Sequence, residues 1–177
     1  MALDSRKEKT RNRLRDAMTQ LMREKPFEEI STTELVEVAQ ISRSSFYTHY
    51  QDKYELIEAY QRTLFSTIEY IFDKSNADFH ATILETYEFL AQNPIYAALL
   101  SENGSKIIHQ FMLQQLKGLL ARKIIPEGHR LVGALSEEYG TTYYAHAIFG
   151  VTQAWLTKKK RETPRVMAQL LNTLIGE

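Results

Sequence analysis

The sequence contains no cysteine among its 177 residues. That absence excludes disulfide bonds, thiolate catalysis and zinc sites with cysteine ligands. The chain also lacks any apolar run that approaches the roughly 20 residues needed to span a bilayer. Its first residues, ALDSRKEKTRNRLR, carry no apolar stretch of the kind found in secretory signals. We therefore expect a cytoplasmic protein without a membrane partner.

Sequence signatures of catalysis and of cofactor binding are missing as well. There is no glycine-rich loop that could cradle a phosphate and no nucleophile motif. The histidines at positions 80, 109, 129 and 146 show no ligand spacing with one another or with acidic residues. We expect neither a metal site nor a cofactor, and the sequence does not favour an enzyme.

Neither sign of charge is in excess overall, because 22 Lys and Arg balance 22 Asp and Glu. This balance argues against general binding to nucleic acid. The distribution along the chain is uneven, since residues 1–15 hold six basic side chains against Asp4 and Glu8, a local excess of four. Such a basic end suits a surface that faces phosphates. It is equally typical of a solvated helix terminus.

The chain shows no alternating strand pattern of useful length, and helical periodicity runs through nearly all of it. Capping boxes begin at Ser31 and Asp52, while Pro94 and Pro164 suit first helical positions. The predicted fold is all-α with about nine helices. These lie at about residues 5–24, 31–39, 43–50, 52 to beyond 71, 77–92, 94–103, 105–123, 134–157 and from 163 onward.

Two short helices joined by a three-residue turn, with another helix before them, indicate a helix-turn-helix. In the second short helix, a step of about 100° per residue brings Phe46 and Tyr50 together, facing the two earlier helices. An aromatic core explains these two rings. It does not explain Tyr47, which falls on the opposite side, because so short a helix cannot bury both faces. The outer face also holds Arg43, Ser44 and Thr48.

Four side chains of this second short helix have chemistry suited to reading base edges. Arg43 can donate two hydrogen bonds to a guanine. Ser44 and Ser45 can donate or accept, and Thr48 offers a methyl group to thymine. The pattern is that of a recognition helix.

Five further side chains suit contacts with the DNA backbone. Tyr47 and His49 can bond to phosphate or sugar, and Lys53 adds a point charge at the start of the next helix. Thr32 and Thr33 lie at the N-terminus of the first short helix, where free backbone amides favour a phosphate.

Residues 30–57, ISTTELVEVAQISRSSFYTHYQDKYELI, resemble the DNA-binding motif of the TetR family of bacterial transcriptional regulators. The resemblance covers about the first third of the chain, and its Phe-Tyr-x-His-Tyr-x-x-Lys segment is quite specific. One departure is Gln40, where the family usually has glycine in the turn. If this position needs a positive φ, glutamine costs about 1 kcal/mol. The DNA-contacting positions that the resemblance implies are Thr32, Thr33, Arg43, Ser44, Ser45, Tyr47, Thr48, His49 and Lys53.

The resemblance also implies how the rest of the chain is organised. Residues 1–53 would form the helix-turn-helix DNA-binding domain, and residues 54–177 a helical regulatory and dimerisation domain. In the family, helices eight and nine pair with their two-fold mates. Packing within the chain is the alternative for each aromatic residue. The implied dimer interface residues are Tyr143, Ala147, Gly150, Ala154 and Trp155.

The implied function is that of a sequence-specific regulator, a repressor that binds a palindromic double-stranded DNA operator as a homodimer and is released by an effector. The alternatives are an activator or a regulator controlled by a protein partner, and, further away, a helical small-molecule carrier or enzyme. The effector is an unknown small molecule or protein, because the pocket of so short a chain could be small or absent. Aromatic stripes at helical spacing are more often core than binding site. The candidate pocket residues are Phe65, Tyr87, Phe89, His109, Phe111, Tyr143 and His146.

Overall fold

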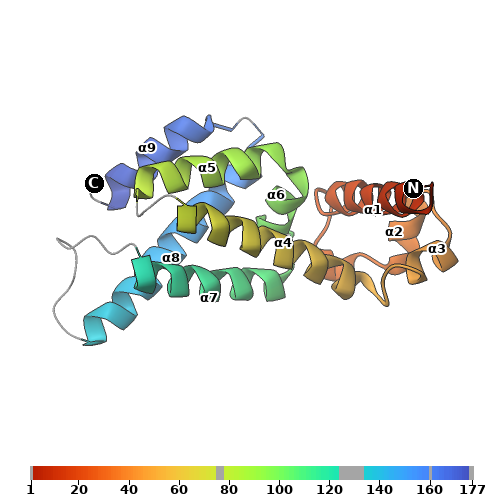
Figure 1. Ribbon diagram of the computed structural model, residues 1–177, viewed down its shortest axis with the longest axis horizontal. Helices are drawn as coiled ribbons and strands as arrows, with labels where there is room; N and C mark the ends of the chain where they lie inside the picture. Colours follow the sequence, from red (N-terminus) through yellow and green to blue (C-terminus); the bar gives the residue numbers. More distant parts are fainter. Residues whose placement is uncertain (1, 75–77, 124–133, 160, 176–177) are drawn as a thin grey trace.

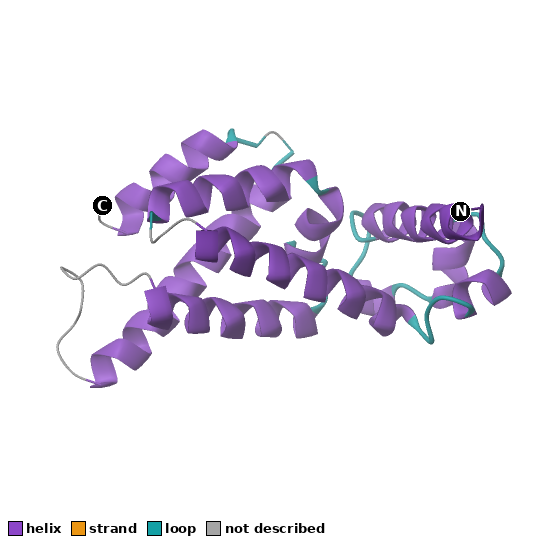
Figure 2. Ribbon diagram, viewed as in Figure 1, coloured by secondary structure: helices purple, strands orange, loops and turns teal. Residues whose placement is uncertain are grey.

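The computed structural model describes residues 2–74, 78–123, 134–159 and 161–175. Within these ranges the chain is helical and contains no strand, which confirms the predicted all-α class (Figures 1 and 2). A single turn of 3₁₀-helix, η1, at Phe27–Glu29, was not predicted. The α-helices are α1 (Ala2–Leu21), α2 (Thr32–Val38), α3 (Arg43–Tyr47), α4 (Lys53–Lys74), α5 (Phe79–Gln92), α6 (Pro94–Leu100), α7 (Lys106–Lys123), α8 (Ala134–Thr157) and α9 (Pro164–Ile175).

Side-chain caps determine where α2 and α4 begin. The Ser31 hydroxyl accepts a hydrogen bond from the backbone N–H of Glu34 at 3.2 Å. The Asp52 carboxylate accepts one from the backbone N–H of Glu55 at 2.9 Å. Each cap satisfies a backbone donor that the first turn of a helix leaves unpaired. The two predicted capping signals are therefore confirmed at the helix starts.

The molecule is elongated, with a lobe at one end and a bundle at the other (Figure 1). Helices α1, α2 and α3 form the lobe, which carries the N-terminal end of the chain. Helices α5, α7, α8 and α9 form most of the bundle, and α4 runs from the lobe into it. Helix α4 is therefore a direct connection between the lobe and the bundle.

The lobe and the bundle share one continuous hydrophobic core. In the lobe, Phe27 and Ile30, from the connection between α1 and α2, are fully buried and pack in the same core as Leu14 and Phe46. In the bundle, α9 packs on α5 and α7 packs on α8. Each short helix of the lobe has too little apolar surface to be stable alone, so its stability comes from this shared burial.

The turn between α6 and α7 fastens the lobe to the bundle. Asn103 donates from Nδ2 to the Met22 carbonyl at 3.0 Å, and its own carbonyl accepts from the Phe27 backbone N–H at 2.8 Å. The next residue, Gly104, packs closely against the C-terminal end of α6. A Cβ at this position would lie 1.9 Å from the Leu99 carbonyl oxygen. The turn at 103–104, between the two helices predicted here, therefore connects the lobe to the bundle. Only glycine fits at position 104.

Among the described helices, none combines the length and the apolar content needed to cross a bilayer.

Candidate DNA-binding surface

The turn between α2 and α3 contains the one described non-glycine residue with a positive φ. This residue is Gln40, with φ of 52°. Left-handed backbone costs an L-residue with a side chain roughly 1–2 kcal/mol. The Arg13 guanidinium from α1 donates to the Gln40 carbonyl at 3.2 Å and so braces the turn. The turn therefore keeps the left-handed geometry that glycine usually adopts, although the residue here is Gln40.

Helix α3 is shorter than predicted and presents its polar side outward. The Ser42 hydroxyl caps it by accepting from the Ser45 backbone N–H at 3.1 Å. The helix ends at Tyr47 rather than near residue 50, and the Thr48 hydroxyl bonds back to the Ser44 carbonyl at 2.9 Å. Such a bond offers the backbone an alternative to continuing the helix.

The two aromatic faces of α3 separate as predicted. Phe46 is fully buried, and Tyr50 is half-buried with its ring 6.0 Å from that of Phe46. The Tyr47 side chain is 58% exposed. Since Tyr47 contributes little to the core, its position on the surface calls for another explanation than packing.

The polar residues predicted to contact DNA gather on one side of the lobe. Arg43 donates from Nη2 to the hydroxyl of Thr33, which joins the starts of α3 and α2. Both Arg43 and Ser44 are exposed, as is Thr48, whereas Thr32 and Ser45 are half-buried. The structure thus brings the two predicted threonines of α2 beside the predicted face of α3.

Basic residues of α1 extend this surface, and sequence patterns alone did not assign them to it individually. Burial, followed by the charges of Arg11 and Lys7, lowers the pKa of His49. These charges are close enough to act because α1 passes beside the end of α3. The signal in the sequence was the basic run of residues 1–15, which was equally compatible with a solvated helix end.

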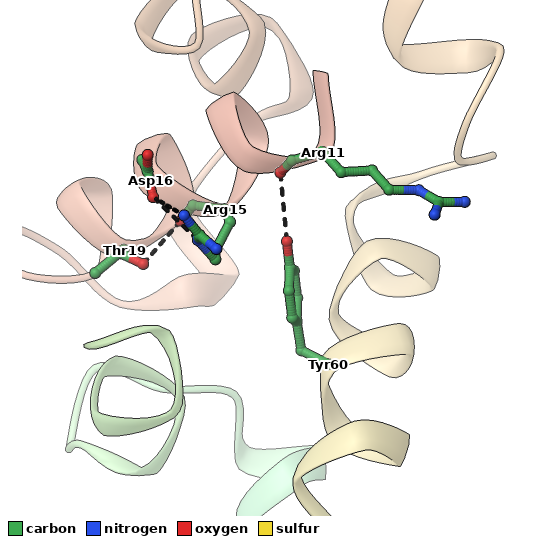
Figure 3. Close-up of polar contacts among 5 residues, drawn as sticks. All are labelled: Arg11, Arg15, Asp16, Thr19 and Tyr60. Atoms are coloured by element: carbon green, nitrogen blue, oxygen red, sulfur yellow. Dashed lines mark hydrogen bonds and ion pairs between the residues drawn. The ribbon is translucent and has the colours of Figure 1, made fainter. Parts of the chain in front are cut away.

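The contact between α1 and α4 sets the position of Arg11. Figure 3 shows Tyr60 of α4 directed at the backbone of α1, where its hydroxyl donates to the Arg11 carbonyl at 3.5 Å, while the Arg11 side chain points away from Tyr60. Nearby, Arg15 pairs with Asp16 at 3.0 Å. Burial raises the pKa of Tyr60, so its hydroxyl stays a neutral donor. The contact with Tyr60 therefore fixes the position of the basic side of α1 relative to α4.

Lys53 does not have the surroundings that the sequence prediction gave it. Its ammonium group is buried and donates to the carbonyls of Phe27, Glu28 and Ile30 at 2.9, 2.8 and 2.7 Å. Burial lowers the pKa of Lys53. All three N–H donors are used within the chain, so the side chain ties η1 to the start of α4 instead of offering a free charge to phosphate. The predicted phosphate contact is wrong for this geometry.

The bundle encloses an apolar cavity of about 70 Å³ between α4, α5, α7 and α8. Of the predicted pocket residues, Phe65 lines it, and Phe111 packs edge-on against Phe65 at 5.9 Å. The Tyr87 hydroxyl bonds at 2.9 Å to that of Thr152, which lines the cavity, and burial raises the pKa of Tyr87 to about 12.

Phe65 is thus the one predicted pocket residue that lines the cavity, and four of the others lie away from it. Phe89 stacks on Tyr96, and the His109 Nε2 atom lies 3.1 Å from the Leu99 carbonyl oxygen. Tyr143 is 68% exposed and His146 is also exposed, because both lie on the outer side of α8. The prediction of Tyr143 and His146 as pocket residues was wrong, since helical spacing alone does not tell which stripe of α8 faces inward.

The outer side of α8 has the small and aromatic residues that were predicted to form a dimer interface, with one exception. Ala147, Gly150 and Ala154 are exposed along with Tyr143. Trp155 is instead 2% exposed. Its ring lies 4.8 Å from that of Tyr87, and its Nε1 donates to the Glu162 carbonyl at 2.9 Å. The assignment of Trp155 to the interface is corrected, because this residue belongs to the core of its own chain.

Helix α9 has an exposed apolar stripe that sequence reasoning missed. Val166, Leu170 and Leu174 are 48%, 44% and 61% exposed. Their spacing of four residues was the signal, since positions i and i+4 share one helix face. The opposite side of α9 packs in the core through Ala168 and Leu171. The helix is therefore apolar on a side that the described chain does not cover.

A three-helix lobe whose last short helix turns a polar face outward, joined by a long helix to a bundle, defines a helix-turn-helix protein. The chain matches the family model for bacterial regulatory proteins of the TetR family over residues 14–60. It matches a transcriptional regulator C-terminal region of the same family over residues 77–177. The chain belongs to the TetR family of bacterial transcriptional regulators. Among curated proteins, none matches it significantly.

Solved structures share the fold along nearly the whole chain. A TetR transcriptional regulator from Streptococcus agalactiae 2603V is 19% identical, with a TM-score of 0.66 over 100% of this chain and 99% of the other. A protein from Syntrophomonas wolfei, described as a TetR-family regulator, is 16% identical at 0.66, with coverages of 95% and 93%. The dihydroxyacetone kinase operon activator DhaS is 21% identical at 0.61, with coverages of 94% and 93%.

Proposed function

We propose that this chain is a homodimeric, sequence-specific DNA-binding regulator that represses transcription from a palindromic operator until an effector releases it. In this proposal residues 1–53 read DNA, and residues 54–177 dimerise and respond to the effector. The observation that carries the proposal is the exposed polar face of α3, with Arg43 and Tyr47, beside the basic side of α1. The bundle is assigned no catalytic role.

Two features of this face support DNA as its ligand. Arginine is the side chain best suited to a guanine edge, to which it can donate two parallel hydrogen bonds. The pKa of His49 is lowered by burial and then by the charges of Arg11 and Lys7, so positive charge lies near this edge of the lobe and suits phosphates. We assign base contacts to Arg43, Ser44, Ser45 and Thr48, and backbone contacts to Thr32, Thr33, Tyr47 and His49, together with Arg11.

Dimerisation follows from the small size of the reading element. A helix of five residues reaches only a few base pairs, whereas a two-fold dimer reads two half-sites about one helical turn apart. The exposed stripes of α8 and α9 are the surface we propose for the dimer. A bundle of four helices, two from each protomer, would cover Tyr143, Gly150 and Leu174.

A second candidate function is activation under the control of a protein partner. The cavity of about 70 Å³ is well below the ~300–1,000 Å³ of ordinary ligand pockets. An effector of ordinary size would have to open the bundle before it could enter. The similar structure of DhaS carries the description of an operon activator. The sign of regulation is distinguished by measuring transcription from the operator with and without this protein.

The test of the DNA-reading face is the affinity of Arg43→Ala for a duplex that the natural chain has selected from random DNA. We expect a loss of about 5- to 150-fold, since a bidentate base contact discriminates by roughly 1–3 kcal/mol. Arg62→Ala is the matched control, because Arg62 lies on α4 and pairs with Glu58 at 3.2 Å. Equal affinity of Arg43→Ala and the natural chain would contradict the proposal.

A further inference from the structure

A second basic surface lies at the junction between the lobe and the bundle, whereas α3 lies at the far end of the lobe (Figure 1). A cleft of about 740 Å³ opens there between Met22 and Arg23 after α1, helix α6, the end of α8, and Lys158, Lys159 and Arg161. Its volume is that of a small-molecule site. Its charged lining residues in the described part of the chain are Arg23, Lys158, Lys159, Arg161 and Glu102.

Most of the basic side chains in this cleft form no ion pair with the described residues. The Lys158 ammonium pairs with the Glu162 carboxylate at 2.5 Å. No such ion pair forms for Arg23 or Arg161 in the same ranges. Burial, and then the charge of Arg23, lower the pKa of Arg161. Arg23 and Arg161 both line the cleft, so an anion bound there would meet two positive charges.

The surroundings of Arg161 hold it ready for a ligand. Its guanidinium lies over the Trp155 ring, 5.6 Å from the centroid, in a cation–π contact. Side chains of Pro94 and Ala98 give the cleft an apolar wall. A ligand with one strongly anionic group and a larger neutral body matches this lining.

We propose that Arg23 and Arg161 bind the phosphate group of a phosphorylated small molecule in this cleft. Two planar guanidinium groups can each donate two hydrogen bonds to the oxygens of one phosphate. The volume exceeds what a phosphate alone would fill, so the organic part of the ligand lies along the wall of α6. This site is separate from the cavity inside the bundle and from the face of α3.

The position of the cleft links the ligand to the orientation of the lobe. Asn103 lines the cleft and also fastens Met22 and Phe27 of the lobe through two hydrogen bonds. A ligand on Arg23 thus acts on the same joint. The effect on DNA affinity rests on the proposed function, whereas binding of the ligand does not.

The binding test uses the fluorescence of Trp155, the only tryptophan of the chain. The full chain is titrated with inorganic phosphate and with glucose 6-phosphate, against potassium chloride of equal ionic strength. We expect a saturable change for both phosphates that is at least about tenfold weaker in Arg23→Gln, since a charged partner has been removed. The control Arg62→Gln should behave like the natural chain. Arg23 is exposed at the end of α1, so its replacement leaves the core intact.

Three results would overturn the site. The first is a fluorescence change that follows ionic strength alone. The second is an Arg23→Gln variant that titrates like the natural chain. The third is citrate that binds as tightly as glucose 6-phosphate, since the site would then not be specific for phosphate. The coupling is measured separately as the affinity for selected duplex DNA with and without glucose 6-phosphate. A shift that Arg23→Gln abolishes supports the coupling, and an unchanged affinity with saturated fluorescence contradicts it. Absence of any DNA binding would contradict the proposed function and leave the site standing.

Discussion

At the scale of single residues, Gln40 carries strain in order to keep the helix-turn-helix geometry. The turn between α2 and α3 needs a positive φ, and the chain supplies it with a residue that has a side chain. From the sequence, strain at Gln40 could be predicted only if the turn needed a positive φ, because local sequence does not reveal a backbone angle. The Arg13 hydrogen bond to the Gln40 carbonyl helps to hold the strained turn.

Replacing Gln40 by glycine should stabilise the protein. Relief of the left-handed strain gains roughly 1–2 kcal/mol, while the greater freedom of glycine in the unfolded chain costs about 0.5–1 kcal/mol. We expect a net gain of up to about 1.5 kcal/mol in the free energy of unfolding, measured by urea denaturation at fixed protein concentration. Gln20→Gly, within α1, should lose about 1 kcal/mol. A loss of stability in both variants would contradict the strain at Gln40.

Lys53 illustrates a residue whose role the structure reassigns. Replacing it by methionine removes the donor from three carbonyls that hold η1 to α4. At about 1 kcal/mol for each hydrogen bond, we expect a loss of roughly 3 kcal/mol in the free energy of unfolding. Lys9→Met, on the exposed side of α1, serves as the control and should change stability little.

The salt dependence of DNA binding distinguishes the two roles of Lys53. A phosphate contact would lower the salt slope by about one when it is lost. We expect folded Lys53→Met protein to keep the slope of the natural chain. A reduced slope with unchanged stability would support the phosphate contact predicted for Lys53 and contradict its structural role.

At the scale of helices, signals that are local in the sequence predicted most of the fold. Ser31 and Asp52 cap the helices that they were expected to cap, and Pro94 and Pro164 stand first in theirs. Each of these signals acts through backbone groups within a few residues, so it can be recognised without tertiary structure.

Surroundings that depend on distant segments could not be predicted in this way. The partners of Lys53 lie up to 26 residues away, and the core position of Trp155 depends on Tyr87 of another helix. Tyr143 was predicted for both the pocket and the interface, and only the packing of α8 shows that it faces outward. The face of α3 was predictable because spacing places its apolar rings, Phe46 and Tyr50, on one side and its polar side chains on the other.

The proposed dimer face on α8 can be tested at Gly150. A Cβ at this position would meet no atom within 4 Å in the protomer, so a larger side chain does not disturb the fold. Gly150→Glu should convert the dimer to a monomer at micromolar concentration, as measured by sedimentation, because it places a charge in an apolar interface. Gly118→Glu on α7, where a Cβ is equally unobstructed, should leave the dimer intact. An unchanged dimer in Gly150→Glu would place the interface elsewhere.

At the scale of the whole molecule, the elongated shape separates the proposed DNA-reading face from the proposed regulatory sites. The lobe with α3 lies at one end, the bundle at the other, and α4 and the joint at Asn103 connect them. A ligand that favours one orientation of the lobe needs a coupling free energy of only ~1–3 kcal/mol to change DNA affinity five- to more than a hundredfold. The short chain therefore has enough structure to be controlled from the bundle, from the cleft, or by a protein partner.

The most direct test of the account is selection of random duplex DNA by the purified natural chain, with sequencing of the bound pool. A two-fold dimer with α3 as the reading element predicts an enriched inverted repeat, whose half-sites lie about one helical turn, ~34–36 Å, apart. A bound pool without any enriched sequence, obtained at low salt from a folded dimer, would contradict a sequence-specific regulator and leave the α3 face without the function proposed for it.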